Sequence, residues 1–382
     1  MTNRWLFALT LTLALAAPLA AQRVYVSGLE NPTKLIAIPN GALLVTQTGA
    51  APNSGRVTLV AAGGAIRNLV AGLPSGLSSP NLDPDGPNGL HLAGRVLYIA
   101  NGEGDALRPG TAPRTAVANP QGVSSPILSS ILKVTFDRDV DQYPSAFTLK
   151  ADDHFNLSLG NTVTLDDGAG RSAVFEMLTN FADTWPDAAA IYRNSHPFGL
   201  AMHAGAANTL FTVDAGMNLV WQTNVTTGRT KVLAQFPNLP NVGPAGPPVK
   251  EAVPNSVKAC GDRLLVSLLS GGPFAPFNSR VMSVNPVTGD TNTYIGSLNS
   301  AIDVGCAARP APANPSYFVL EYSVNQGATP LPPGRLLRYD SPSATVVLDG
   351  IKTPVSLALD ETSGDAFIAS RSDGTIITTK FR

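Results

Sequence analysis

The chain has 382 residues, of which only 14% are charged, and its formal net charge is −1. Nucleic acids and anionic membrane surfaces attract clusters of Lys and Arg, and the sequence holds no such cluster, so we expect neither as a partner. Glycine (35 residues) and proline (32 residues) are spread along the whole chain, which indicates many turns and no single disordered segment.

The N-terminal segment, residues 1–21, is typical of a cleaved bacterial secretory signal. Arg4 supplies a positive charge, an uncharged run follows from Trp5 to Ala17, and small residues lead to the predicted cleavage site. The apolar run is shorter than the roughly 20 residues that a membrane span needs. An uncleaved membrane anchor is the alternative. We therefore expect a secreted or periplasmic protein that is not inserted in a membrane after cleavage.

After this segment, one pattern recurs six times along the chain. Each copy opens with Pro-x-x-Leu or a close variant and continues with further short apolar runs. Pro suits the first residue of a strand, where its missing N–H removes no ladder hydrogen bond. Short, nearly continuous apolar runs are typical of strands buried on both faces. The six openings are residues 32–35, 87–90, 197–200, 254–257, 301–304 and 354–357.

Repeated four-stranded units of this kind predict an all-β fold, a six-bladed β-propeller. The two ends of the chain support a closed ring. The last copy stops after its third strand, at residues 375–381, while residues 24–29 have the character of a fourth strand that belongs to no other copy. We expect residues 24–29 to pair beside residues 375–381, because this closure leaves no long open sheet edge.

The interval between the second and third openings is roughly twice as long as the others. A seventh blade is the less favoured explanation, since residues 137–187 contain one evident hairpin and no complete set of four strands. We therefore expect a single propeller domain over residues 22–382 with an insertion at about 137–187.

Several phrases, taken in order, resemble the ScyD/ScyE family of exported NHL/TolB-like propellers. The most distinctive is Gly-Gly-Pro-Phe-Ala-Pro-Phe at residues 271–277, shortly before Arg280. The others are residues 194–200, 213–216, 252–257, 301–304 and 319–322. The resemblance implies an exported six-bladed propeller; the family is associated with synthesis of the pigment scytonemin and supplies no catalytic residue set. The chain departs from the family by its 137–187 insertion and by two cysteines.

These cysteines occupy equivalent positions in neighbouring copies. Cys260 ends the first strand of one copy and Cys306 ends the first strand of the next. In an oxidising compartment two such residues can form a bridge between blades, and we predict this disulfide. The alternative is two buried thiols, which would result if the strands were separated by more than about 7 Å between Cα atoms.

Propeller ligands bind where the blades meet the central channel, and the openings bring four polar residues to one mouth of it. They are Asn88, His196, Asn255 and Asp303. Side chains of these types could coordinate Ca²⁺, which is a possible cofactor, or orient a polar substrate. The alternative is that these short polar side chains cap turns and strand ends.

No familiar catalytic motif occurs in the sequence: there is no Gly-x-Ser-x-Gly, His-Glu-x-x-His, phosphate-binding glycine loop or Cys-x-x-Cys. The leading hypothesis is therefore a monomeric binding or interaction module, whose partner at the channel mouth is an unknown small molecule or protein. The alternative is an enzyme, either a Ca²⁺-dependent lactonase-like hydrolase or a quinone-dependent sugar dehydrogenase.

Overall fold

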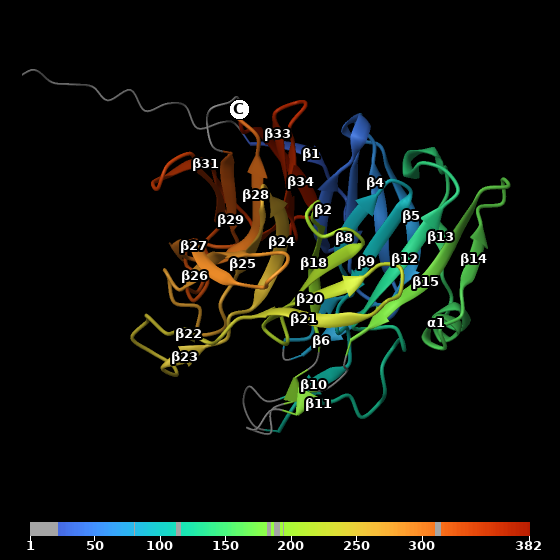
Figure 1. Cartoon of the computed structure of the whole chain (residues 1–382), viewed down its shortest axis with the longest axis horizontal. Coiled ribbons are helices and arrows are strands. Elements are labelled where there is room, and N and C mark those ends of the chain that lie inside the picture. Colours follow the sequence, from blue (N-terminus) through green and yellow to red (C-terminus); the bar gives the residue numbers. More distant parts are fainter. Residues whose placement is uncertain are drawn as a thin grey trace, which may run out of the picture.

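The structure is a computed structural model that describes residues 22–79, 81–111, 116–181, 185–186, 192–193, 195–309 and 315–382. The predicted signal segment, residues 1–21, lies outside the described residues. Over the described residues the fold is mostly β and forms a six-bladed propeller, as the repeat predicts. The blades are arranged in a ring (Figure 1), and the first strands of consecutive blades pack against one another around its centre.

Each blade is an antiparallel sheet whose strands follow one another from the channel outward. Every blade begins at the residue that opens the repeat, which is Pro in five blades and Ala301 in the fifth. Blade 1 contains β2 (Pro32–Ala37), β3 (Leu43–Gln47), β4 (Gly55–Val60) and β5 (Ile66–Leu73), and blade 2 contains β8 (Pro87–Ala93), β9 (Val96–Asn101), β12 (Ser130–Phe136) and β15 (Ser172–Asn180). Blade 3 contains β18 (Pro197–Met202), β19 (Thr209–Asp214), β20 (Leu219–Asn224) and β21 (Thr230–Gln235), and blade 4 contains β24 (Pro254–Cys260), β25 (Arg263–Leu268), β26 (Ser279–Val284) and β27 (Thr291–Leu298). Blade 5 contains β28 (Ala301–Ala307), β29 (Ser316–Glu321), β30 (Gly334–Tyr339) and β31 (Ala344–Ile351), and blade 6 contains β32 (Pro354–Asp360), β33 (Asp365–Ser370) and β34 (Thr375–Lys380).

The fourth strand of blade 6 is β1 (Arg23–Val26), from the other end of the chain. It runs antiparallel to β34, with Arg23 opposite Thr378 and Val24 opposite Ile377. Figure 1 shows the two strands side by side where the red end of the chain meets the blue end. The predicted closure of the ring is confirmed.

The remaining elements are short and lie in the connections. β6 (Gly76–Ser78) pairs with β7 (Asp83–Asp85), β10 (Leu107–Pro109) with β11 (Ala116–Ala118), β16 (Trp185–Pro186) with β17 (Tyr192–Arg193), and β22 (Leu239–Pro240) with β23 (Val249–Lys250). Two 3₁₀ turns cover Pro39–Gly41 and Val140–Gln142.

The long interval between openings adds structure to the outer rims of blades 1 and 2. β13 (Phe147–Thr148) pairs in parallel with β5 of blade 1, while β14 (Val163–Asp166) forms the predicted hairpin with β15 of blade 2. α1 (Ala151–Ser158) lies between β13 and β14 in the chain, and Figure 1 shows it near the outer edge of blade 2. The fourth strand of blade 2 is thus formed by residues within the 137–187 segment.

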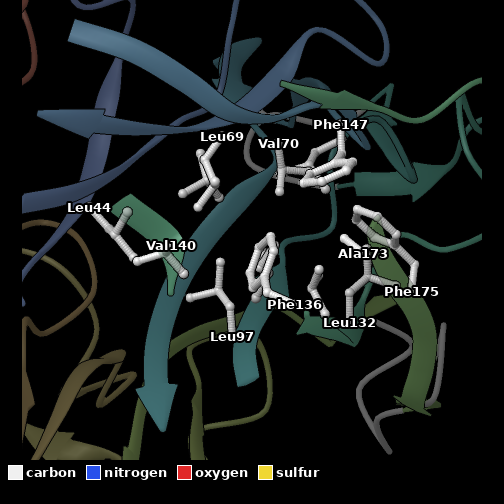
Figure 2. Close-up of a cluster of buried hydrophobic side chains, with 14 of the residues drawn as sticks. Leu44, Leu69, Val70, Leu97, Leu132, Phe136, Val140, Phe147, Ala173 and Phe175 are labelled. Carbon is white, nitrogen blue, oxygen red and sulfur yellow. The ribbon is translucent and has the colours of Figure 1, made fainter. Parts of the chain in front are cut away.

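This segment is held to the propeller by an apolar cluster between blades 1 and 2. Figure 2 shows Phe136 and Phe175 of blade 2 pointing toward Val70 of blade 1 and toward Phe147 from the inserted segment. The Phe147 ring lies 5.1 Å from the ring of Tyr143, and both side chains are fully buried. Since full burial of one large apolar side chain contributes about 1.5–3 kcal/mol, the cluster attaches the segment firmly to the blades.

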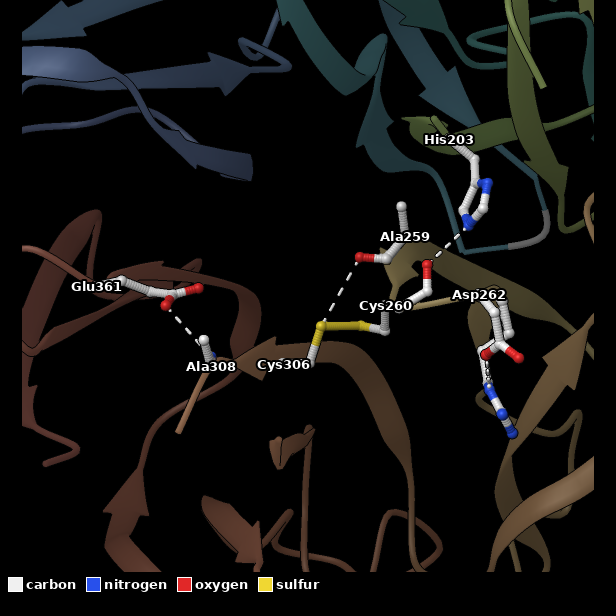
Figure 3. The surroundings of a disulfide bond; sticks show 9 residues. His203, Ala259, Cys260, Asp262, Cys306, Ala308 and Glu361 are labelled. Carbon is white, nitrogen blue, oxygen red and sulfur yellow. Dashed lines mark hydrogen bonds and ion pairs between the residues drawn. A yellow bond between two sulfur atoms is a disulfide. The ribbon is translucent and has the colours of Figure 1, made fainter. Parts of the chain in front are cut away.

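A disulfide joins blades 4 and 5, as predicted. Cys260 at the end of β24 is bonded to Cys306 in β28, and their Cα atoms lie 6.1 Å apart (Figure 3). Closing a loop of this length stabilises a fold by about 4 kcal/mol on the chain-entropy estimate. Structural disulfides persist in oxidising compartments outside the cytoplasm. In the described part of the chain, no helix has the length and apolarity needed to cross a membrane.

Candidate functional site

Every first strand carries a β-bulge at its opening. In β8, for example, Pro87 lies opposite Asn101 and Gly89 opposite Ala100, so that Asn88 has no counterpart on β9. In β24, β28 and β32 the same second residue is skipped, and in β2 and β18 the register shifts within the second and third residues. A bulge redirects the side chain of the extra residue.

The bulges direct six side chains, one from each blade, into a single cavity at the channel mouth. This polar cavity has a volume of about 350 Å³. Its ring of second residues consists of Thr33, Asn88, Phe198, Asn255, Ile302 and Val355. Connecting segments complete the lining, with Asn81, Asp83, Leu269, Phe274, Tyr322, Gln326 and Arg371, and Lys34 reaches it from the channel. A small concave site with apolar walls and a few fixed polar groups is typical of ligand-binding pockets.

Two amide oxygens of the polar cavity have no hydrogen-bond partner. They are Oδ1 of Asn255 and Oε1 of Gln326, and both atoms are buried among the described residues. A buried acceptor without a donor costs about 1–3 kcal/mol, so native structures rarely retain one without a reason. Neither oxygen is exposed to solvent, so each would meet a bound molecule only after its side chain changed rotamer.

His196, the residue before the blade 3 opening, lies behind the ring and does not line the cavity. Its Nε2 atom is 3.1 Å from Oδ1 of Asp85, and the same carboxylate oxygen accepts a hydrogen bond of 2.6 Å from Nδ2 of Asn88. On the other side, the His196 ring lies 4.6 Å from the ring of Phe198. His196 and Asp85 thus support two of the residues that line the cavity.

His196 carries a positive charge at neutral pH. Burial opposes the charge, but the carboxylates of Asp85 and Glu103, with a smaller effect from Asp214, raise the pKa of His196 to about 9. Burial likewise opposes ionisation of Asp85, yet the adjacent histidinium holds its pKa below the usual value. Burial raises the pKa of Glu103, whose Oε1 accepts a hydrogen bond of 2.7 Å from Ser78.

We expect His196→Gln to lower the free energy of unfolding by about 3 kcal/mol at pH 6.5. A pKa raised from 6.5 to about 9 stabilises the fold fully below pH 6.5, and this contribution is lost as the pH rises through 9. The difference between wild type and variant should therefore shrink by most of its value between pH 6.5 and pH 9. Urea unfolding at several pH values in this range measures it, and a difference that stays constant would contradict the assignment.

Asp303 lies one level deeper in the channel, where the third residue of each opening is found. Its side chain is fully buried, and its oxygens accept hydrogen bonds from Nζ of Lys34 (2.8 Å), Oγ of Ser356 (2.9 Å), the backbone N–H of Leu357 (2.9 Å) and Oγ of Ser256. This carboxylate therefore connects blades 1, 4, 5 and 6. We call Lys34, Ser256, Asp303 and Ser356 the channel plug.

Asp303 carries a negative charge at neutral pH. Burial opposes the charge on Asp303, but Lys34 and Lys258 together with the hydrogen bonds hold its pKa at about 2. Asp303 does not line the polar cavity but lies beneath it. Its acceptor positions are occupied by donors of the protein.

The four residues singled out in the sequence thus have three different positions. Asn88 and Asn255 line the cavity together, His196 supports Asn88 from behind, and Asp303 holds the plug. Sequence reasoning missed the plug lysine, Lys34, and the polar lining residues from the connecting segments. Within the described residues, no three or more His, Cys, Asp or Glu side chains are grouped so that they could hold a metal ion, and calcium at this mouth stays a prediction.

No family model and no curated protein matches the chain. Several solved structures are similar to it in fold. A protein of unknown function from Bacteroides thetaiotaomicron VPI-5482 has a TM-score of 0.50 at 11% identity, over 94% of this chain and 76% of its own. An auxiliary nutrient binding protein from the same organism has a TM-score of 0.50 at 10% identity, over 92% and 69%.

A third solved structure, streptogramin B lyase, has a TM-score of 0.48 at 11% identity, over 94% of this chain and 96% of its own. The chain has a β-propeller fold. At identities this low the first two likenesses show the fold alone, and function must be argued from the site.

Proposed function

We propose that this propeller is an exported binding module whose polar cavity holds a small, uncharged molecule of the carbohydrate class. The observation that carries the proposal is the lining of this cavity, in which the amide side chains of Asn255 and Gln326 lie among apolar and aromatic side chains. Sugar hydroxyls are donors as well as acceptors, and they can satisfy amide groups of both kinds. The C–H faces of a sugar ring would pack against Phe198 or Phe274 in the same lining.

The charges around the polar cavity favour a neutral ligand. Lys34 is already paired with Asp303 at 2.8 Å. Of the other lining residues that the structure describes, Asp83 is acidic and Arg371 is basic, so the two formal charges cancel. A ligand with a net charge would lose hydration without gaining a dedicated partner, which is costly in a partly enclosed site.

An exported setting and kinship with the ScyD/ScyE family are part of the same proposal. The family-like phrase at residues 271–277 contributes Phe274 to the cavity lining, so the resemblance includes the candidate site. The disulfide between Cys260 and Cys306 suits an oxidising compartment, in agreement with a signal at residues 1–21.

We expect a neutral monosaccharide to bind the wild-type protein, and Asn255→Ala to weaken this binding about tenfold or more because one amide contact is lost. Calorimetric titration with D-glucose, D-galactose, N-acetyl-D-glucosamine and myo-inositol tests the neutral class, and D-glucuronate tests the charged class. The matched control is Asn292→Ala, which removes an exposed amide from the outer strand of the same blade. If no neutral probe binds, or if both variants bind equally well, the proposal is wrong.

A further inference from the structure

The channel has a second cavity, at the end opposite to the polar one. The opening residues of the first strands line the polar cavity. Residues near the other end of these strands, such as Ile36 of β2 and Leu359 of β32, line the second cavity. Its volume is about 310 Å³. We call it the apolar cavity, because most of its lining is aliphatic: it includes Ile36, Leu90, Leu92, Leu200, Met202 and Leu359.

Only two ionisable side chains line the apolar cavity among the described residues, Lys258 and His91. Lys258 is half-buried, and no described residue forms a salt bridge with it. The charge of Asp303 acts on Lys258, but the carboxylate oxygens of Asp303 already accept hydrogen bonds from Lys34 and from other donors of the plug. As far as the structure describes the chain, the apolar cavity thus contains a cation without a salt-bridge partner and no acidic side chain in its lining.

We propose that the apolar cavity binds a small amphiphilic carboxylate, with its hydrocarbon part against the aliphatic lining and its carboxylate on Nζ of Lys258. Such a ligand matches both properties of the site. Burial of its apolar part contributes about 0.8 kcal/mol per CH₂ group. A carboxylate that reaches Lys258 gains a charge-assisted hydrogen bond, which is stronger than a bond between neutral groups.

The ionisation states of the two lining groups agree with this choice. Burial, together with the charge of Lys34, lowers the pKa of Lys258 to about 8, which leaves the amine mostly protonated at pH 7. Burial, reinforced by Lys258, lowers the pKa of His91 to about 4, so the imidazole is neutral and adds no charge. The charged groups that act on Lys258 are Lys34 and Asp303 of the plug, and the charged group that acts on His91 is Lys258 itself.

The wall of the apolar cavity is covalently braced. Ala259, between Lys258 and the disulfide-bonded Cys260, also lines the cavity. Figure 3 shows Ala259 beside the sulfur–sulfur bond that joins its strand to β28. A strand held in this way presents Lys258 from a fixed position, which lowers the entropy cost of binding.

Titration of the full-length mature protein with hexanoate at pH 7 tests the proposal by calorimetry. We expect saturable binding, about tenfold weaker binding of butyrate because two methylene groups are lost, and at least tenfold weaker binding of hexanamide, which has no charge. Lys258→Met should weaken hexanoate binding at least tenfold, whereas Lys231→Met, at an exposed lysine on β21, should leave it unchanged.

Two further measurements keep the test decisive if Lys258→Met fails to fold. Ala259→Leu narrows the apolar cavity at an exposed position and should weaken hexanoate binding while Lys258 remains. Asn255→Ala, in the polar cavity, should leave hexanoate binding unchanged, which separates this site from the proposed sugar site. The proposal would be overturned if hexanoate did not bind or if hexanamide bound equally well. It would also be overturned if Lys258→Met and Ala259→Leu both bound hexanoate as tightly as the wild type.

Discussion

Asp303→Asn should lower the free energy of unfolding by about 3–5 kcal/mol, the cost of removing one partner from a buried ion pair. Asparagine keeps the size of the side chain but removes the charge that faces Lys34, whose side chain is itself only 6% exposed. The ammonium group would then remain in the channel without a counter-charge. Hydrogen bonds from three other blades would also lose their charged acceptor, so the loss should affect the whole ring cooperatively.

A double-mutant cycle separates the pair from its surroundings. Urea unfolding of Asp303→Asn, Lys34→Met and the double variant should show the double variant to be more stable than the sum of the two single effects predicts, by at least about 1 kcal/mol. The matched control is Asp349→Asn, at an exposed aspartate on β31 of the same blade, which should change stability by less than about 0.5 kcal/mol. Equal effects at positions 303 and 349 would show that the plug does not stabilise the ring.

The blades were predictable because their signal is local. An apolar run with Pro at its start predicts a buried strand wherever it occurs, and the strand starts at Pro32, Pro87 and Pro354 follow from such runs alone. The six copies reinforce one another, since each blade needs its neighbours to bury its faces. The N-terminal segment resembles a fourth strand without a blade of its own, and the last blade lacks a fourth strand. Pairing the two closes the ring.

The candidate site was only partly predictable because of the bulges. In a regular strand, side chains alternate between faces, so neighbours in the sequence point apart. The bulge shifts this alternation by one residue at each opening, and no residue pattern reveals where the shift falls. Asn88 and Asn255, as second residues, therefore line the polar cavity, while Asp303, as a third residue, is withdrawn into the plug.

The third residues also show why side-chain identity differs between blades. At Gly89 a Cβ atom would lie 1.9 Å from the carbonyl oxygen of Phe198, and at Gly199 it would lie 2.8 Å from Cα of Ser256. Blades 2 and 3 thus approach their neighbours too closely for any side chain at this level. The lysine and the aspartate stand on blades 1 and 5, and their pairing across 269 positions of sequence had no local signal.

Closure of the ring carries the second large expected effect. Val26→Asp should destabilise the protein by about 3 kcal/mol or more, because it places a charge where the valine is only 8% exposed. Val26 packs with Leu35 of blade 1 and with Phe367 and Ile376 of blade 6 in one cluster. A charge at this position would detach β1 and open the ring between the last blade and the first.

The control lies on the same strand. Val24 is 56% exposed, so Val24→Asp should cost less than about 0.5 kcal/mol while introducing the same charge. Detachment of β1 also leaves the edge of β34 unpaired, and unpaired edges associate with other chains. The Val26 variant should therefore show concentration-dependent aggregation during urea unfolding, whereas the Val24 variant should not. If the two variants are equally stable and equally monomeric, β1 does not hold the ring closed. A fourth strand that is essential for closure cannot tolerate a buried charge where it contacts blades 1 and 6.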